Sequence, residues 1–203
     1  MVMHTLQALA QVPGLISGWV IVSPNDNFHW PVETWPDRFR RLACGGACRA
    51  ESVFNGLSGM LASGVAAQDW VLVHDAARCL VQPHEVSALV QACGQDAVGG
   101  LLAQPMTDTL KTQWPDAPSA RVDTTLPREG KWLAQTPQMF RLGALHGALA
   151  QVAGDGFAGI TDEASAMERL GLRPLLVPGS AQNFKVTYPV DFALAETILR
   201  SRK

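Results

Sequence analysis

Short valine-rich runs alternate with amphipathic stretches along almost the whole chain, and this alternation constrains the fold more than any other feature of the sequence. Residues 70–74 (WVLVH) begin with four consecutive apolar residues and are rich in valine, which is typical of a strand buried on both faces of a parallel sheet. Residues 50–61 carry apolar side chains at helical spacing. The pattern predicts an α/β protein with a mostly parallel, Rossmann-like sheet flanked by helices.

The remaining elements are predicted from the same periodicities and from their boundary residues. Pro83 and Pro189 are each expected to open a helix, and Gly171 to follow the end of one. We expect further strands at residues 19–23, 41–44, 99–103, 132–136, 175–177 and 183–187, and helices at 4–11, 84–93, 142–152, 161–170 and from 189 onward.

The alternation is interrupted between residues 106 and 131. Two short β-like runs, 108–111 and 121–124, flank a proline-containing turn, which predicts a projecting β-hairpin. A segment this short cannot bury a core of its own, and an isolated hairpin is marginal in water. We therefore predict a single domain over residues 1–203, with 106–131 as an arm that packs against a second copy of the chain.

Composition excludes several classes of protein. Sixteen Lys and Arg residues against eighteen Asp and Glu give a net charge of -2, and no basic tract extends beyond residues 38–41, so nucleic-acid binding is not expected. The longest apolar stretch, residues 14–22, is too short to cross a bilayer, and the first five residues do not resemble a signal peptide. We expect a cytoplasmic protein with no membrane partner.

The four cysteines do not predict a metal site or a disulfide framework. Cys44 and Cys48 have the spacing of a ligand pair, but no second Cys or His pair completes a four-ligand zinc site. Together with Cys79 and Cys93 they are expected to be ordinary small thiols. We expect no metal ion held by protein side chains.

One polar cluster follows the strand at residues 70–74. Asp75 and Arg78 come directly after it, and in open α/β sheets ligands bind at the carboxyl ends of the strands. The two alanines between them leave room for a close ligand. The alternative is a strand-end turn closed by a surface ion pair.

A second cluster precedes the helix at residues 50–61. Gly45, Gly46 and Ser52, with Arg49 between them, could hold an anionic or ribose oxygen through amides and a hydroxyl. A plain Gly-Gly turn into a helix explains the same residues equally simply.

Four further polar residues are individually weaker candidates. Arg128 and Thr136 belong to a run that a loop leading into a strand would also explain, and Thr161 is typical of a helix cap. Lys185 lies in an apolar run. Because burying an unpaired lysine is costly, its ammonium must reach either an anion or water.

One feature that is usual in nucleotide-binding α/β domains is not found. Such domains usually open with a strand and a glycine-rich turn whose amides hold phosphate at a helix N-terminus. Here the G-x-G-x-x-G pattern occurs at residues 154–159, after an expected helix instead of a strand, and we interpret it as a connector. The phosphate loop is expected to lie elsewhere or to be missing from this chain.

Taken together and in order, these motifs resemble one family. The runs are GGACRAESVFNGL, VHDAAR, DTLK, REGKWLAQTPQ, TDEASAME and NFKVT, beginning at residues 45, 73, 108, 128, 161 and 183. They are similar to those of 2-C-methyl-D-erythritol 4-phosphate cytidylyltransferases over nearly the whole chain. The resemblance implies a nucleotidyltransferase sheet and an enzyme of the non-mevalonate isoprenoid pathway. Such an enzyme joins CTP to methylerythritol phosphate and releases diphosphate, with Mg²⁺ bound through the CTP phosphates.

The resemblance also implies roles for individual residues. Lys185 and Arg128 would be catalytic, with Lys185 orienting the attacking phosphate. Thr109 and Arg128 would reach from the arm into the partner subunit's site in a homodimer. The methylerythritol phosphate site would be lined by Asp75, Arg78, Thr109, Thr136 and Thr161, and the cytidine would contact Gly45, Gly46, Ser52 and the backbone of Ala76.

Two departures from the family pattern leave alternatives open. Ala47 stands where some relatives have an acidic residue, and the A-A-G-x-G-x-R loop and P-K-Q segment of the family are not found. We therefore expect the chain as given to be a poor catalyst. The alternatives are a catalytically impaired or non-catalytic dimeric module of the same fold, or a related sugar-phosphate nucleotidyltransferase.

Overall fold

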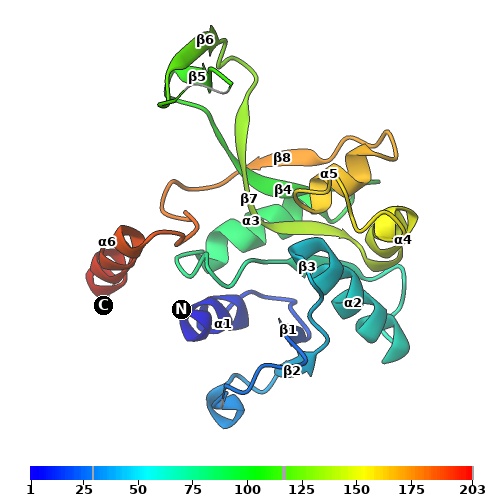
Figure 1. Ribbon diagram of the computed structural model, residues 1–203. Helices are drawn as coiled ribbons and strands as arrows, with labels where there is room; N and C mark the ends of the chain where they lie inside the picture. The colour runs from blue at the N-terminus through cyan, green and yellow to red at the C-terminus, as the bar shows by residue number, and fades with distance from the viewer. Residues whose placement is uncertain (29, 116–117, 203) are drawn as a thin grey trace.

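Four strands form the central sheet, in the order β3–β7–β4–β8 (Figure 1). The computed structural model describes residues 1–28, 30–115 and 118–202; His29 and two residues of the predicted hairpin turn, Asp116 and Ala117, lie outside the described residues. The strands β3 (Trp70–Val73), β4 (Gly99–Pro105) and β8 (Leu175–Pro178) are mutually parallel, and β7 (Trp132–Arg141) is antiparallel to its neighbours. The predicted α/β class with a mostly parallel sheet is confirmed.

The strand expected at residues 132–136 is twice that length and runs against the others. The reason is the hairpin arm, which turns the chain back onto β4 so that Trp132 pairs with Pro105. The amide of Met106 donates to the carbonyl of Lys131 at the same point. A hairpin connection joins antiparallel strands, whereas a parallel pair needs a crossover.

A second, two-stranded sheet consists of β1 (Gly18–Val22) and β2 (Phe39–Ala43), which pair in parallel. In the described part of the chain neither strand pairs with the central sheet, whereas the sequence predicts one sheet. A cavity of about 350 Å³ lies between the two sheets, with Trp19 of β1 and Val71 of β3 in its wall.

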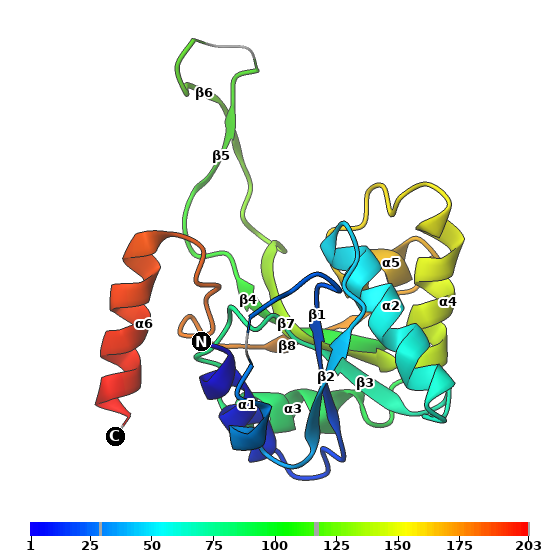
Figure 2. The same cartoon turned by 60° about the horizontal axis from the view of Figure 1, so that its bottom comes forward.

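Alternating side chains on the strands create two apolar faces, which different helices cover (Figure 2). Leu101 of β4 packs with α2 (Arg49–Ala62), α4 (Leu142–Ala153) and α5 (Glu163–Glu168). The next residue, Leu102, packs with α3 (Pro83–Cys93) on the opposite face, and α1 (Val2–Ala10) lies beside α3. The result is a three-layer arrangement, with helices on both faces of the central sheet.

The predicted helices are present, with one corrected start. The cap of α5 is Asp162 and not Thr161, because the Asp162 carboxylate accepts from the amide of Ser165 and satisfies the first turn. This helix ends at Glu168, and Gly171 follows in the left-handed conformation, at φ 76°. The last helix, α6, spans Pro189–Ser201 and begins at its proline as expected.

Residues 183–187 form a loop and not the predicted strand. Their polar groups bond to neighbouring loops instead of a sheet ladder: the Val186 amide donates to the carbonyl of Ala77, and the Asn183 carbonyl accepts from Arg78. The loop of residues 183–187 is therefore hydrogen-bonded directly to the segment that follows β3.

The predicted hairpin is present as β5 (Leu110–Gln113) and β6 (Val122–Leu126), and it projects well beyond the body of the molecule (Figure 1). Trp114 and Val122 on this arm are each 59% exposed. A short 3-10 helix, η1 (Val32–Thr34), completes the elements of the described chain. Among the described helices, none is both long and apolar enough to span a bilayer.

Candidate active site

Three segments meet just beyond the carboxyl end of β3 and hold one another in place. The Arg78 guanidinium donates to the Asn183 carbonyl at 2.7 Å and to the Ala134 carbonyl at 3.3 Å. The fully buried Asn183 in turn donates from Nδ2 to the carbonyl of Thr136 at 2.9 Å. These bonds fix the loop of residues 183–187 so that Lys185 lies beside Asp75.

A row of alternating charges runs through this junction. Asp75 accepts from Arg49 Nε at Oδ1, at 2.8 Å, and from Lys185 Nζ at Oδ2, at 3.1 Å. The Arg49 guanidinium also binds both oxygens of Glu163, at 2.6 and 3.1 Å. Since the row Glu163–Arg49–Asp75–Lys185 links α5, α2, β3 and the loop before α6, it ties four separate parts of the fold to one site.

The inner end of the row is buried and the outer end is open. Glu163 is 2% exposed, and burial raises its pKa although Arg49 opposes the shift. Burial also acts to raise the pKa of Asp75, but Arg49 and Lys185 outweigh it and hold that pKa below its usual value. The Lys185 side chain is 46% exposed, so its ammonium is the group of the row that an arriving anion meets.

His74 and Thr136 hold the backbone of Asp75 in place through two linked hydrogen bonds. The amide of Asp75 donates to Thr136 Oγ1 at 3.0 Å, and this hydroxyl lies 3.0 Å from His74 Nδ1. His74 Nε2 lies 3.2 Å from the carbonyl of Arg78, which can only accept, so the ring carries its proton on Nε2 and accepts from Thr136 at Nδ1. Burial lowers the pKa of His74 to about 4, which agrees with a neutral ring.

The glycine loop before α2 does not form the amide cradle considered from its sequence. The amides of residues 45–47 already donate, to the carbonyl of Val22, the hydroxyl of Ser52 and the carboxylate of Glu51. The Ser52 hydroxyl also donates to the carbonyl of Cys48 and so fastens the first turn of α2. The three amides of residues 45–47 are therefore occupied by bonds within the protein.

Most of the sequence-predicted residues come together here. Asp75, Arg78, Thr136 and Lys185 are joined directly or through one shared partner. Thr161 is exposed and lies two residues before Glu163, the inner end of the charge row. The remaining residues of this group, Gly45, Gly46, Ser52 and Ala76, lie at the start of α2 and at the end of β3. Their contacts with substrates stay predictions.

Two predicted residues are not brought to the site within one chain. Thr109 and Arg128 are exposed and lie at the two ends of the arm. The Arg128 guanidinium donates to the carbonyl of Thr107, and in the described part of the chain it has no contact with Asp75 or Lys185. The alternative for residues 75–78, a turn closed by a surface ion pair, does not involve Arg78, because Arg49 and Lys185 occupy the Asp75 carboxylate.

Comparison with known proteins identifies the family of this fold and site. A sequence profile of the family described as 2-C-methyl-D-erythritol 4-phosphate cytidylyltransferase matches residues 1–201. The chain belongs to this family. The enzyme of that name from Chromobacterium violaceum is 49% identical over 203 residues, covering 98% of this chain and 84% of its own length.

Other relatives agree with this assignment. A bifunctional enzyme IspD/IspF from Albidiferax ferrireducens is 57% identical over 202 residues, and the chain spans 46% of it. A crystal structure of a 4-diphosphocytidyl-2C-methyl-D-erythritol synthase is 42% identical, with a TM-score of 0.87 over 98% of this chain and 90% of that one. The Francisella tularensis cytidylyltransferase structure is 31% identical, with a TM-score of 0.81 over 97% and 86%.

The described residues do not fit a protein-held metal ion. No group of three or more His, Cys, Asp or Glu side chains that could hold one occurs among them. Both oxygens of Asp75, the carboxylate nearest to the open end of the site, are bonded to cations of the protein. A divalent cation would therefore depend on ligands from the substrate.

Arg49 and Glu163 carry the charge row, yet sequence reasoning named Arg49 only as part of the possible anion-binding cluster at residues 45–52 and did not place Glu163 in the site. A signal was present, because Arg49 occupies the first turn of α2, where a positive charge opposes the helix dipole and needs another partner to keep it there. That partner lies 114 residues further along the chain, so local pattern could not find it.

Proposed function

We propose that this chain transfers the cytidylyl group of CTP to 2-C-methyl-D-erythritol 4-phosphate, forming 4-diphosphocytidyl-2-C-methyl-D-erythritol and diphosphate. The family match over residues 1–201 and the names of the curated relatives support this activity. The observation that carries it is the Lys185–Asp75 pair. A half-exposed ammonium, held by a carboxylate at the end of a core strand, is suited to a phosphate monoester.

The proposed reaction needs no protein nucleophile. An oxygen of the substrate phosphate attacks the α-phosphorus of CTP, and the bond from this phosphorus to the oxygen of the departing diphosphate breaks. Catalysis then consists of holding the two phosphates in line and neutralising their charge. Lys185 orients the attacking phosphate, and Arg78 acts indirectly, because its guanidinium holds the loop that carries Lys185.

Magnesium enters the proposal only as a companion of the nucleotide. Because the described side chains do not assemble a metal site, Mg²⁺ would be bound through the CTP phosphates and would supply charge neutralisation there. No step assigned to the chain's own residues depends on it.

The second part of the proposal is a cytoplasmic homodimer with composite sites. Thr109 and Arg128 are exposed on the projecting arm, and neither contacts Asp75 in the described part of the chain. Trp114 and Val122 leave apolar surface uncovered on this arm, and a hairpin of this size needs packing. A twofold-related copy would cover that surface and bring Arg128 to the partner's charge row.

The activity is tested by following diphosphate release with CTP, Mg²⁺ and methylerythritol phosphate. We expect Lys185→Ala to lower turnover by about 100- to 1000-fold, the usual effect of removing one preorganised donor, with little change in melting temperature. Arg200→Ala is the control, because it removes a cation that forms an exposed ion pair in α6.

Two results would count against the proposal. Absence of a cytidylyl product from the parent protein would reject the activity. Near-normal turnover of Lys185→Ala, or a loss matched by early melting, would make Lys185 a structural residue.

A further inference from the structure

The ring of His74 uses both of its nitrogens inside the protein. Nδ1 lies 3.0 Å from Thr136 Oγ1, and Nε2 lies 3.2 Å from the carbonyl oxygen of Arg78. A neutral imidazole has one acceptor and one donor, and both are engaged here. His74 precedes Asp75 directly in the chain, yet its ring has no free nitrogen with which to move a substrate proton or bind a metal ion.

The ring holds the turn of residues 75–78 at both of its ends. At the beginning of the turn, the Thr136 hydroxyl donates to His74 Nδ1 and accepts from the amide of Asp75 at 3.0 Å. At the end of the turn, His74 Nε2 donates to the carbonyl of Arg78, and the amide of Arg78 donates to the carbonyl of Asp75 at 2.9 Å. The backbone of the turn is therefore tied to the side chain of the residue before it.

Two sets of contacts lead from this turn to the Lys185 ammonium. In the first, the carboxylate of Asp75 binds Lys185 Nζ at 3.1 Å. In the second, the turn holds the loop that carries the lysine: the Arg78 guanidinium donates to the carbonyl of Asn183 at 2.7 Å, and the Val186 amide donates to a carbonyl of the turn at 2.9 Å. A shift of the turn would move the carboxylate and the loop together, and the ammonium with them.

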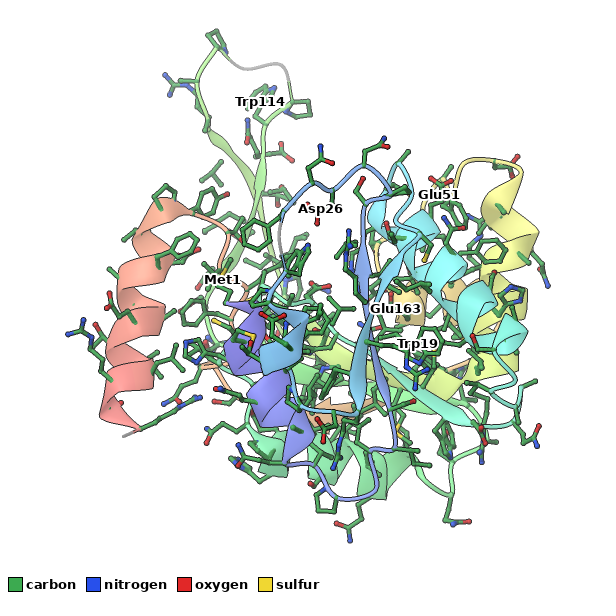
Figure 3. The ribbon with its side chains drawn as sticks, turned by 90° about the horizontal axis from the view of Figure 1, so that it is seen from below. Met1, Trp19, Asp26, Glu51, Trp114 and Glu163 are labelled. Atoms are coloured by element: carbon green, nitrogen blue, oxygen red, sulfur yellow. The ribbon has the colours of Figure 1, made fainter. Side chains whose placement is uncertain are left out.

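The other ion pair of Asp75 is anchored in the body of the same chain. Arg49 binds Asp75 at 2.8 Å and also binds Glu163. Figure 3 shows Glu163 inside the body of the molecule and Trp114 on the projecting arm. Because Arg49 is fixed at this inner end, a displaced turn would have to lengthen at least one of the two ion pairs of Asp75.

We propose that His74 is a positioning residue of the transfer reaction: its ring fixes the turn of residues 75–78 and, through the turn, the place of the Lys185 ammonium. The inference rests on the proposed function, in which Lys185 orients the attacking phosphate. His74 takes no part in the bond changes themselves.

A second histidine–hydroxyl pair in the chain supplies a matched control. His146 Nε2 of α4 lies 3.0 Å from Ser58 Oγ of α2, and the ring of His146 stacks on Phe54 with 4.7 Å between the centroids. In the described part of the chain this pair has no hydrogen bond to the turn or to Lys185. If His74 only stabilises the fold, replacing either histidine should change the melting temperature and leave kcat unchanged.

The test measures kcat, KM and the melting temperature in the parent protein and in His74→Phe, His74→Gln and His146→Phe. Phenylalanine keeps a ring but removes both bonds, whereas glutamine again offers one donor and one acceptor. We expect His74→Phe to lower kcat by about 10- to 100-fold with KM for CTP unchanged, because a small misplacement of a positioned group has an effect of this size. His74→Gln should recover part of the loss, and His146→Phe should keep the parental kcat.

The same substitutions in a Lys185→Ala background test whether His74 acts through Lys185. A positioning residue has little effect once the group that it positions is gone, so His74→Phe should then lower kcat by less than about threefold. Nuclear magnetic resonance of the imidazole nitrogens examines the ring itself. At about neutral pH the parent should show a neutral His74 with its hydrogen on Nε2.

The inference is overturned by an unchanged kcat in His74→Phe, by an equal loss in His146→Phe, by a loss that is undiminished in Lys185→Ala, or by a hydrogen on Nδ1. If His74→Phe fails to fold, His74→Gln must show a smaller loss that likewise disappears in Lys185→Ala. A parent protein that transfers nothing refutes the proposed activity and not the role of His74. Calorimetry with methylerythritol phosphate then decides that role, because His74→Phe must weaken binding only while Lys185 is present.

Discussion

Removing the Arg49 guanidinium would leave a buried carboxylate without its counter-charge. In the structure both oxygens of Glu163, which is 2% exposed, accept from Arg49 at 2.6 and 3.1 Å. Breaking a buried ion pair from one side costs about 3–5 kcal/mol. Because the Arg49 side chain is 33% exposed, water can enter the vacated volume, and we expect Arg49→Met to lower the free energy of unfolding by about 3 kcal/mol.

The loss should depend on pH in a defined direction. Burial raises the pKa of Glu163, and without Arg49 the influence that opposes burial is gone. The folded variant then binds a proton more readily than the unfolded chain does. The contribution of Glu163 to the variant's stability is therefore greatest at low pH and falls as the pH rises past 4.5, the ordinary pKa of a glutamate. The destabilisation relative to the parent protein should grow over the same range.

Urea unfolding of the parent and of Arg49→Met, from near pH 4.5 to about pH 8, measures both quantities. Arg200→Met is the control: its ion pair with Glu196 is 2.6 Å long but 76% and 63% exposed, so it should lose at most about 1 kcal/mol. The double variant Arg49→Met/Glu163→Met removes the orphaned charge and should recover much of the loss. An Arg49→Met protein no weaker than the control, or a loss that is flat with pH, would refute the reasoning.

Two further predictions concern His74 and the arm. Because burial holds the pKa of His74 near 4, below its ordinary 6.5, the unfolded chain binds the proton first, and stability should fall as pH drops from about 6.5 to about 4. Measured by urea unfolding, the free energy of unfolding of His74→Gln should fall less steeply over this pH range. An equal dependence on pH in both proteins would contradict the assignment of this titration to His74. For the arm, Asp75→Ala and Arg128→Ala should each be nearly inactive alone and regain up to about half of parental activity as co-expressed mixed dimers, because one site then has both residues intact. No recovery in proven mixed dimers would place Arg128 in its own subunit's site.

Local pattern predicted the elements well where one physical signal dominated. The run 70–74 begins with four apolar residues, and these form β3. Pro83 and Pro189 open α3 and α6, as their fixed φ favours. The prediction failed at residues 183–187, which were expected to form a strand. The backbone groups of this segment form hydrogen bonds with the loop after β3 instead of with a neighbouring strand. Tertiary contacts decide between these two conformations, and local sequence does not record them.

The direction of a strand was a second property that the sequence did not predict. A run such as residues 132–136 has the same composition whichever way the strand runs. Only the connection to the preceding strand decides whether the pair is parallel or antiparallel. The hairpin between β4 and β7 made an antiparallel pair possible, although the arm itself was predicted. The separation of β1 and β2 from the central sheet also had no signal in the composition of either strand.

The sequence predicted the motifs of the site, but not the row of ion pairs that connects them. Asp75 and Lys185 stood out because each is a charge beside an apolar strand or run, and a charge there must have a partner. What the structure adds is that Asp75 serves two cations at once, at 2.8 and 3.1 Å. When an anion reaches Lys185 from the open side, Asp75 still has Arg49, so no buried charge is left unpaired. The alternating row thus allows the outermost cation to turn toward a phosphate without disrupting the buried pair behind it. Under the proposed function, Lys185, the more exposed of the two cations, is therefore the one that can meet a phosphate while Arg49 stays bound to Asp75 and Glu163.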